Sequence, residues 1–120
     1  MNNQPKILIC DDEEGIRESL NLILKDTYNL KFACSGTECL KTLGEDKDIK
    51  VVLMDIKMPK QNGIDITRDI KRLNPDIKVM IVTGYESAEI AQEATAAGAD
   101  AYITKPFESR TILKKVQSFC

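Results

Sequence analysis

The stretch Val51-Val52-Leu53-Met54-Asp55 is a short apolar run that ends on a carboxylate, and three further runs have the same form. Ile7-Leu8-Ile9-Cys10 leads into Asp11-Asp12, Val79-Met80-Ile81-Val82 into Thr83, and Ala101-Tyr102-Ile103-Thr104 into Lys105-Pro106. Short apolar runs are typical of strands in a parallel sheet that is covered on both faces. Because ligands bind outside the carboxyl ends of such strands, we expect these polar residues to meet in one crevice.

Stretches with helical spacing separate the runs, so that strand-like and helix-like segments alternate five times. Their apolar residues recur at i, i+4 and i+7, which places them on one face of a helix. We expect the following residues to face the core: Ile16, Leu20, Ile23, Leu24, Leu40, Leu43, Ile66, Ile70, Leu73, Ile90, Ala94, Ala97, Ile112, Val116 and Phe119. This alternation predicts an α/β fold, with a parallel sheet between two layers of helices.

Residues with known capping roles mark the helix boundaries. Ser35 precedes Glu38 by three positions and Thr83 precedes Glu86 by three, which is the spacing of a capping box. Asn74-Pro75 predicts the end of the third helix, because the residue before a proline disfavours helical geometry. Gly98 is placed to cap the end of the fourth helix.

The composition of the strands predicts their order. The runs at 7–10, 51–54 and 79–82 are apolar throughout, whereas 28–32 alternates and 101–104 is only weakly apolar. Alternation indicates one solvated face, so we expect the second and fifth strands at the edges. That arrangement matches the order 2-1-3-4-5, whose switch point lies between the first and third strands. The length of 120 residues fits one domain, 1–120.

Composition and charge restrict the possible functions. The net charge of −2 argues against a nucleic-acid surface spread over the domain. No apolar run approaches the ~20 residues that a membrane span needs, and the N-terminus lacks a secretory signal. Four cysteines without a Cys-x-x-Cys motif fit neither a zinc site nor a disulfide framework, so we expect reduced cysteines in the cytoplasm. Without histidine, the chain has no imidazole to act as base, metal ligand or phosphoryl carrier.

The residues at the strand ends suit a divalent cation and a phosphoryl group. Three clustered carboxylates, Asp11, Asp12 and Asp55, repel one another unless a cation neutralises them or one is protonated. Oxygen ligands favour a hard ion such as Mg²⁺, for which Mn²⁺ is a possible substitute. A carboxylate can attack phosphorus directly to give an aspartyl phosphate. Lys105 and Thr83 would then compensate charge and donate hydrogen bonds, together with the backbone amide of Gly84.

These motifs together resemble the receiver domain of two-component response regulators over nearly the whole chain. The matching features are Asp11-Asp12, Met54-Asp55-Ile56-Lys57-Met58-Pro59 with Gly63 following, Thr83-Gly84, and Lys105-Pro106-Phe107. The resemblance implies a flavodoxin-like (βα)₅ fold with Asp55 as phosphoacceptor. It further implies that Asp12, Asp55 and the backbone carbonyl of Lys57 hold Mg²⁺, with Asp11 acting mostly through water. Thr83 and Lys105 would contact the phosphoryl group.

The resemblance also implies a regulatory cycle rather than turnover of an external substrate. A sensor histidine kinase or histidine phosphotransfer protein would supply the phosphoryl group. Thr83 would move toward it, and Tyr102 would turn inward. The face formed by the fourth helix, fifth strand and fifth helix would then change its affinity for an output domain or protein, or form a dimer. The Lys105-Pro106 peptide would be cis, and Lys57 and Tyr85 would influence the lifetime of the phosphoryl group.

Alternative interpretations remain open from the sequence. A small phosphohydrolase of the haloacid-dehalogenase type also combines aspartates, threonine, lysine and Mg²⁺, but its nucleophile lies in an Asp-x-Asp motif that Asp11-Asp12-Glu13 lacks. A flavodoxin-like electron carrier would need aromatic flanks that a chain without tryptophan and with three tyrosines hardly offers. A receiver that binds partners without phosphorylation is the third alternative. Tyr102 could also be a static edge residue.

Overall fold

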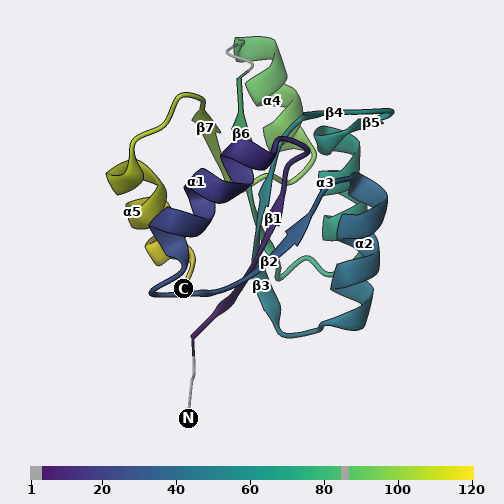
Figure 1. The fold of residues 1–120 in the computed structure, drawn as a ribbon. Coiled ribbons are helices and arrows are strands. Elements are labelled where there is room, and N and C mark those ends of the chain that lie inside the picture. The colour runs from purple at the N-terminus through teal and green to yellow at the C-terminus, as the bar shows by residue number, and fades with distance from the viewer. Residues whose placement is uncertain (1–3, 85–86) are drawn as a thin grey trace.

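A computed structural model describes residues 4–84 and 87–120 of the chain. Five parallel strands form one sheet: β1 (Lys6–Cys10), β2 (Asn29–Ala33), β3 (Ile49–Met54), β6 (Lys78–Thr83) and β7 (Ala101–Thr104). Their order is β2-β1-β3-β6-β7, which confirms the predicted order 2-1-3-4-5 and the flavodoxin-like arrangement (Figure 1).

Five helices cover the two faces of the sheet: α1 (Glu14–Leu24), α2 (Gly36–Glu45), α3 (Gly63–Leu73), α4 (Ala88–Ala96) and α5 (Ser109–Phe119). Helices α1 and α5 lie on one face, and α2, α3 and α4 lie on the other. The register explains why both faces are apolar. Leu8 pairs with Val52 in the layer beneath α2 and α3, while Ile9 pairs with Leu53 in the layer beneath α1 and α5. Each central strand therefore contributes side chains to two separate core layers.

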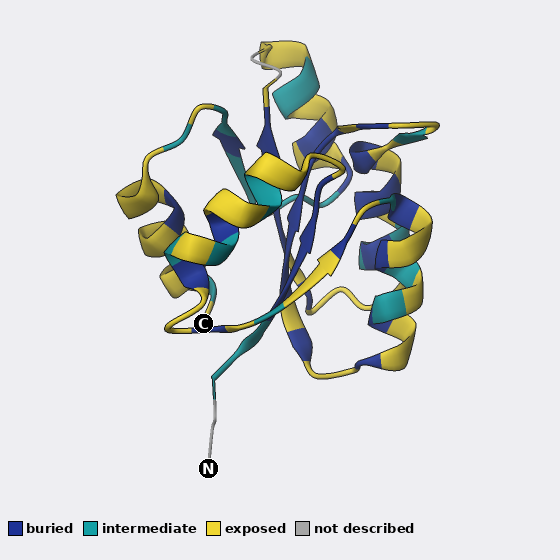
Figure 2. Ribbon diagram, in the orientation of Figure 1, coloured by how far each residue is buried: buried dark blue, intermediate teal, exposed yellow. Residues whose placement is uncertain are grey.

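The edge strands differ from the central ones as their composition predicts. Most residues of β2 are exposed or half-buried, and Phe32 on this strand remains exposed (Figure 2). In contrast, β6 is buried from Val79 to Thr83. Among the described residues, no helix is long and apolar enough to cross a membrane.

Most of the predicted helix boundaries are confirmed. The Ser35 hydroxyl accepts a hydrogen bond of 3.1 Å from the Glu38 amide at the start of α2. Asn74 ends α3. Gly98 follows α4 with a φ of 106°, and its neighbour Ala99 donates a hydrogen bond back to the Ala94 carbonyl. A positive φ at this point is the usual reason for glycine after a helix.

Two of the expectations are wrong. The capping box at Thr83 does not begin α4: Glu86 lies outside the described residues, and the helix instead begins after Ser87, whose hydroxyl accepts from the Ile90 amide. Leu73 is 73% exposed and does not face the core. It is the last residue of α3, where the apolar periodicity continues one position beyond the part of the helix that packs on the sheet.

The sequence also gave no indication of a small antiparallel hairpin formed by β4 (Lys57–Met58) and β5 (Gln61–Asn62). Lys60 turns this hairpin with a φ of 62°. Gln61 ties it to the start of α2, because its side chain bonds both the Thr37 hydroxyl and the Thr37 amide. The hairpin is thus held in place by α2 and lies beside the carboxyl end of β3.

Candidate functional site

The predicted site residues meet at the carboxyl edge of the sheet. Asp11 and Asp55 follow β1 and β3, Thr83 ends β6, and Lys105 follows β7. Backbone hydrogen bonds continue the ladders past the strand ends: the Asp55 amide donates to the Cys10 carbonyl at 3.0 Å, and the Lys105 amide donates to the Thr83 carbonyl at 2.8 Å. The sheet itself therefore fixes the positions from which these side chains project.

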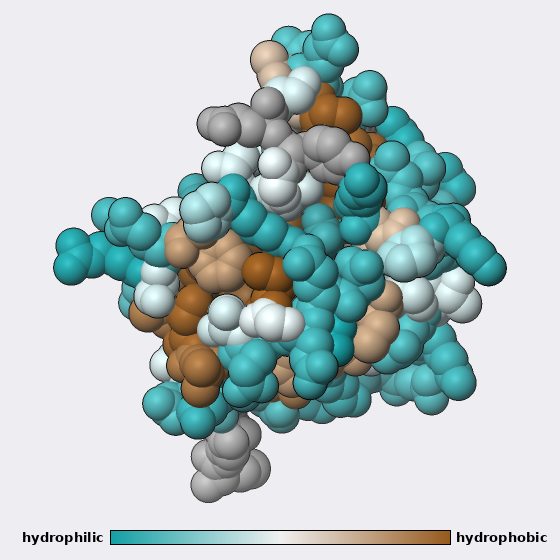
Figure 3. All heavy atoms as spheres, turned by 45° about the horizontal axis from the view of Figure 1, so that its top comes forward, coloured by the Kyte–Doolittle hydropathy of each residue, from teal (hydrophilic) through white to brown (hydrophobic). Residues whose placement is uncertain are grey.

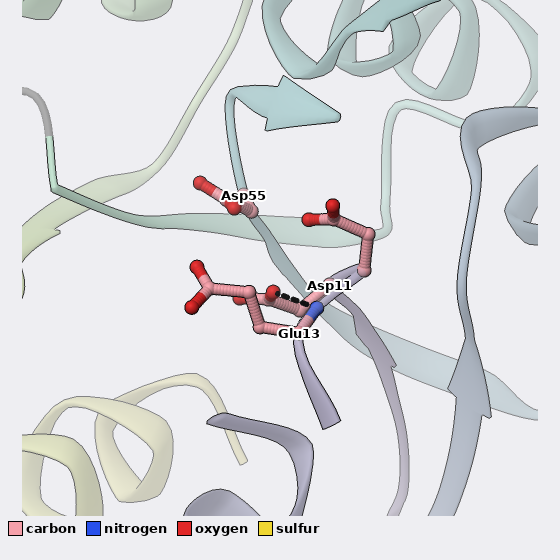
Figure 4. Close-up of side chains that lie close together, drawn as sticks. Asp11, Glu13 and Asp55 are labelled. Atoms are coloured by element: carbon pink, nitrogen blue, oxygen red, sulfur yellow. Dashed lines mark hydrogen bonds between the residues drawn. The ribbon is translucent and has the colours of Figure 1, made fainter. Parts of the chain in front are cut away.

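Four carboxylates gather at this edge. Asp11 and Asp55 are 2% and 5% exposed, whereas Asp12 and Glu13 are exposed. Asp11, Asp12, Glu13 and Asp55 can each offer one ligand atom, and these atoms all lie within 4.8 Å of one another. Figure 4 shows Asp11, Glu13 and Asp55 close together, with the Glu13 amide donating a hydrogen bond of 2.9 Å to Asp11. Such a set of oxygen donors fits a hard divalent cation.

Lys105 lies among these carboxylates. Its Nζ is 2.9 Å from Asp11 Oδ2, 3.4 Å from Asp55 Oδ2 and 3.5 Å from Glu13 Oε1. Burial opposes the charged form of Lys105, but the hydrogen bond and charge of Asp11, with the charges of Asp55 and Glu13, outweigh it and raise its pKa. The ammonium is therefore firmly protonated and already in contact with the predicted phosphoacceptor.

The environment of Asp55 raises the pKa of its carboxyl group, whereas an ordinary ion pair would lower it. Burial and the negative charge of Asp11 raise the pKa of Asp55, and Lys105 and a hydrogen bond with Thr83 offset only part of this rise. Thr83 is itself fully buried. The arrangement places a destabilised carboxylate next to one cation and one hydroxyl, where added positive charge would stabilise its ionised form.

An open cleft of about 740 Å³ lies above this cluster. The residues that line it are Asp12, Glu13, Asp55, Lys57, Met58, Pro59, Lys60, Gly84 and Lys105. The lining of the cleft thus combines carboxylates with Lys105 and with lysines of the β4–β5 hairpin. Its size and composition suit an anionic group bound together with a cation.

The remaining predicted residues have clear positions where they are described. The Lys105–Pro106 peptide bond is cis, as the resemblance implies. Tyr102 is half-buried and packs against the core layer beneath α2, α3 and α4. Tyr85 lies outside the described residues.

Two contributors were not among the predicted site residues. Glu13 adds a fourth carboxylate and contacts Lys105. The feature of the sequence that could have indicated its role is its position directly after Asp11-Asp12. Arg17 of α1 donates a hydrogen bond of 2.9 Å to the backbone carbonyl of Asp11. This contact fastens the turn that carries the acidic residues, and nothing in the local sequence indicates it.

Comparison with known proteins assigns the family. Residues 7–117 match the family described as response regulator receiver domain. A response regulator MprA from Mycolicibacterium vanbaalenii is 31% identical over 114 residues, which are 94% of this chain and 49% of that protein. The chain spans about half the length of the curated relatives it matches.

Solved structures agree with this assignment. A CheY-like response regulator receiver domain protein from Methanospirillum hungatei has a TM-score of 0.90 at 35% identity, covering 97% of this chain and 93% of that one. A chain of the CheX-CheY-BeF3-Mg²⁺ complex from Borrelia burgdorferi has a TM-score of 0.90 at 25% identity, covering 94% of this chain and 87% of that one. With the fold, the acidic cluster and the family match in agreement, the chain belongs to the response regulator receiver domains of two-component signal transduction.

Proposed function

We propose that this receiver domain accepts a phosphoryl group from a phosphohistidine of a sensor histidine kinase or histidine phosphotransfer protein onto Asp55. The strongest support for this proposal is the environment of the Asp55 carboxylate. The Asp55 carboxylate is buried at the floor of the cleft, 3.4 Å from the Lys105 ammonium and hydrogen-bonded with Thr83. A nucleophile, a cation and a hydroxyl donor therefore converge on one point.

In the transfer, an oxygen of Asp55 attacks phosphorus, the phosphorus–nitrogen bond of the donor breaks, and its electron pair returns to the imidazole. The ionised form of Asp55 attacks, and Lys105 favours that form. Lys105 and Thr83 then contact the phosphoryl oxygens, and the Gly84 amide donates a further hydrogen bond. Phosphoryl transfer needs mainly alignment and charge neutralisation, which these groups supply.

The carboxylates at the cleft fit Mg²⁺, with Mn²⁺ as a substitute. Asp12 and Asp55 would hold it with the backbone carbonyl of Lys57, and Asp11 would act mostly through water. When bound, the ion neutralises part of the negative charge shared by the carboxylates and the phosphoryl oxygens. The CheX-CheY complex from Borrelia burgdorferi contains BeF3 together with Mg²⁺, which supports a phosphoryl group bound together with a cation in this chain.

In this proposal, the response to phosphorylation passes through Thr83 and Tyr102. Thr83 moves toward the phosphoryl group, Tyr102 turns further inward, and the face of α4, β7 and α5 changes. Tyr102 already packs against the core layer that includes Ala94 of α4. A local charge change thereby biases a two-state element. Lys57 and Tyr85 modulate how long the phosphoryl group survives hydrolysis.

The phosphohistidine protein docks near α1 and α5. Figure 3 looks toward the carboxyl edge of the sheet and shows apolar side chains on the side that carries these helices. Leu22 of α1 and Leu113 of α5 are exposed large apolar side chains on these two helices. The relatives are about twice as long as this chain, so we infer that residues 1–120 form a receiver unit acting on an output domain or protein. The receiver does not itself bind nucleic acid, and a phosphorylation-dependent dimer is one form of output.

Incubation with Mg²⁺ and acetyl phosphate, followed by intact mass spectrometry, tests the proposal. We expect one added phosphoryl group per chain, its loss in Asp55→Ala, and no reaction when EDTA removes Mg²⁺. Lys41→Met changes an exposed lysine away from the cleft and serves as the control. A mass increase that survives Asp55→Ala would overturn the assignment. Steady release of phosphate from a monoester would instead support the phosphohydrolase alternative.

A further inference from the structure

Arg17 lies on α1 beside the acidic turn, and the proposed phosphoryl transfer gives it no role. Its Nη1 atom donates a hydrogen bond of 2.9 Å to the backbone carbonyl of Asp11, which directly follows β1. Glu14 and Glu18 line the same shallow hollow as Arg17, yet the guanidinium forms no ion pair with any carboxylate among the described residues. Arg17 therefore contacts the backbone of the turn rather than a charged side chain.

The backbone of Arg17 is fixed by the helix that carries it. Its amide donates a hydrogen bond of 3.1 Å to the carbonyl of Glu13, the residue before α1. Helix α1 packs on the sheet through the buried side chains of Leu20 and Leu24. The half-buried side chain of Arg17 then reaches back across the turn to Asp11. Arg17 thus braces the turn between β1 and α1 against the helix.

The side chain of Asp12, in the same turn, depends on its backbone for its position. The neighbouring carboxylate of Asp11 is held at both oxygens, by the Glu13 amide at 2.9 Å and by the Lys105 ammonium at 2.9 Å. Within the described part of the chain, the exposed carboxylate of Asp12 makes no hydrogen bond and no ion pair. The direction of the Asp12 side chain is therefore set by the peptide units on either side of it.

The hydrogen bond from Arg17 restrains one of those peptide units. The Asp11 carbonyl and the Asp12 amide belong to a single planar unit, which moves as a rigid body. A donor that holds the carbonyl therefore also holds the plane from which the Asp12 side chain projects. In this orientation, the ligand oxygen of Asp12 lies within 4.8 Å of the ligand atoms of the other three carboxylates in the cluster, Asp55 among them.

We propose that Arg17 is a positioning residue for the divalent cation: by holding the Asp11 carbonyl, it orients Asp12 toward the ion and so increases the affinity of the site. This inference rests on the proposed Mg²⁺ site, for which Mn²⁺ is a substitute, and not on the transfer of the phosphoryl group. Groups that orient metal ligands change metal affinity by about 10–100-fold when they are removed. The charge of Arg17 acts in the opposite direction, because a positive charge beside the carboxylates repels a cation.

These two effects differ in sign, so a single substitution separates them. If Arg17 acted only through its charge, Arg17→Met would bind a divalent cation more tightly, because the repulsion is removed. If Arg17 orients Asp12, Arg17→Met binds the cation more weakly despite that gain. Arg17→Lys keeps the positive charge and a donor on a shorter side chain. Arg68→Met is the matched control, since it removes an exposed arginine of α3 that does not line the cleft.

Electron paramagnetic resonance of free Mn²⁺ measures the Kd of each chain for the ion, without a phosphodonor and at constant ionic strength. We expect Arg17→Met to raise this Kd about tenfold, Arg17→Lys to recover part of the loss, and Arg68→Met to bind as the unmodified chain does. Circular dichroism without metal checks the fold, and Arg17→Gln, which is also neutral, replaces Arg17→Met if that chain does not fold. Equal or tighter binding by the neutral variant would overturn the proposal.

A double-mutant cycle tests whether Asp12 is the group that Arg17 positions. Asp12→Asn should weaken Mn²⁺ binding, and adding Arg17→Met should cause little further loss, because the oriented carboxylate is already gone. A further loss of about tenfold would show that Arg17 acts through another group and would overturn the assignment. If the unmodified chain binds no Mn²⁺, the cation site and this inference fail together. If Mn²⁺ affinity depends on Arg17 while acetyl phosphate does not modify Asp55, only the proposed function fails.

Discussion

The ammonium of Lys105 lies 2.9 Å from Oδ2 of Asp11, although 94 positions separate the two residues in the chain. This contact joins the turn after β1 to the turn after β7, across the opening where Asp55 lies. It holds Lys105 within 3.4 Å of Asp55 before any phosphoryl group arrives. The cation is thus positioned in advance, so little reorganisation is needed when negative charge increases at the site.

Replacing Lys105 should therefore impair phosphorylation more than it impairs folding. In Lys105→Met, the initial rate of phosphorylation by acetyl phosphate should fall on the order of a hundredfold, as when one preorganised charge-stabilising donor is removed. Lys41→Met should react at the original rate, because Lys41 is exposed and does not line the cleft. Intact mass spectrometry over time measures both. A Lys105→Met chain that reacts as fast as Lys41→Met would remove Lys105 from the proposed chemistry.

The raised pKa of Asp55 predicts that its ionisation costs stability. A group whose pKa is higher in the folded than in the unfolded chain stabilises the fold at low pH, and this contribution is lost as pH rises through the folded pKa. In metal-free buffer, Asp55→Asn should therefore raise Tm near pH 7. The gain should shrink toward zero below about pH 4, where the unmodified carboxylate is protonated as well. Thermal denaturation across pH measures it, and a lower Tm for Asp55→Asn at neutral pH would contradict the inferred repulsion.

At the other end of the sheet, the carboxylate of Asp46 should make stability depend on pH in the opposite direction. Its carboxylate lies 2.7 Å from Lys31 Nζ and 3.0 Å from Lys6 Nζ, and the hydrogen bonds from Lys31 and Lys6 hold its pKa well below its usual range. Its ionised form stabilises the fold above the unfolded pKa, and this stability is lost as pH falls through the folded value. Asp46→Asn should lower Tm by a few degrees near neutral pH and have little effect in strong acid. Asp48→Asn, which changes an exposed neighbour, is the control. An equal loss in both variants would show that the ion pairs of Asp46 with Lys6 and Lys31 are not responsible.

The parts of the site that the sequence predicts are those determined locally. Asp11, Asp55, Thr83 and Lys105 each follow or end an apolar run, and parallel strands bring such ends together whatever the intervening loops do. Contacts that depend on the whole fold were missed. Glu13 meets Lys105 from 92 positions away, and the two-residue strands of the β4–β5 hairpin are too short for any periodicity to reveal. Leu73 fits the helical pattern, but periodicity does not tell where α3 passes the end of the sheet.

Gly63 occupies a position where any side chain should destabilise the fold. A Cβ added there would overlap the backbone carbonyl of Asp55, and the Gly63 amide donates a hydrogen bond of 2.7 Å to the Ile56 carbonyl. Gly63→Ala should lower the free energy of unfolding by about 1–3 kcal/mol, because well-packed backbone must shift. Gly15 lies in α1 with no atom within 4 Å of an added Cβ. Gly15→Ala should therefore raise the free energy of unfolding by about 0.5–1 kcal/mol, since alanine favours the helix. Urea denaturation distinguishes the two, and equal effects would mean that the close approach to Asp55 can relax freely.

Tyr102 is the residue through which we expect the phosphorylated site to reach α4 and α5. Its ring is half-buried against the core layer that includes Ala94, so turning further inward would change how α4 packs. Beryllofluoride with Mg²⁺ is a stable substitute for the phosphoryl group. It should alter hydrogen exchange across α4 and β7 in the unmodified chain and in Tyr102→Phe, which keeps the ring. In Tyr102→Ala the compound should still bind at Asp55, but the change in exchange at α4 should largely disappear, because no ring fills the space that Thr83 leaves. An undiminished response in Tyr102→Ala would mean that Tyr102 is a static edge residue and that the signal reaches α4 by another route.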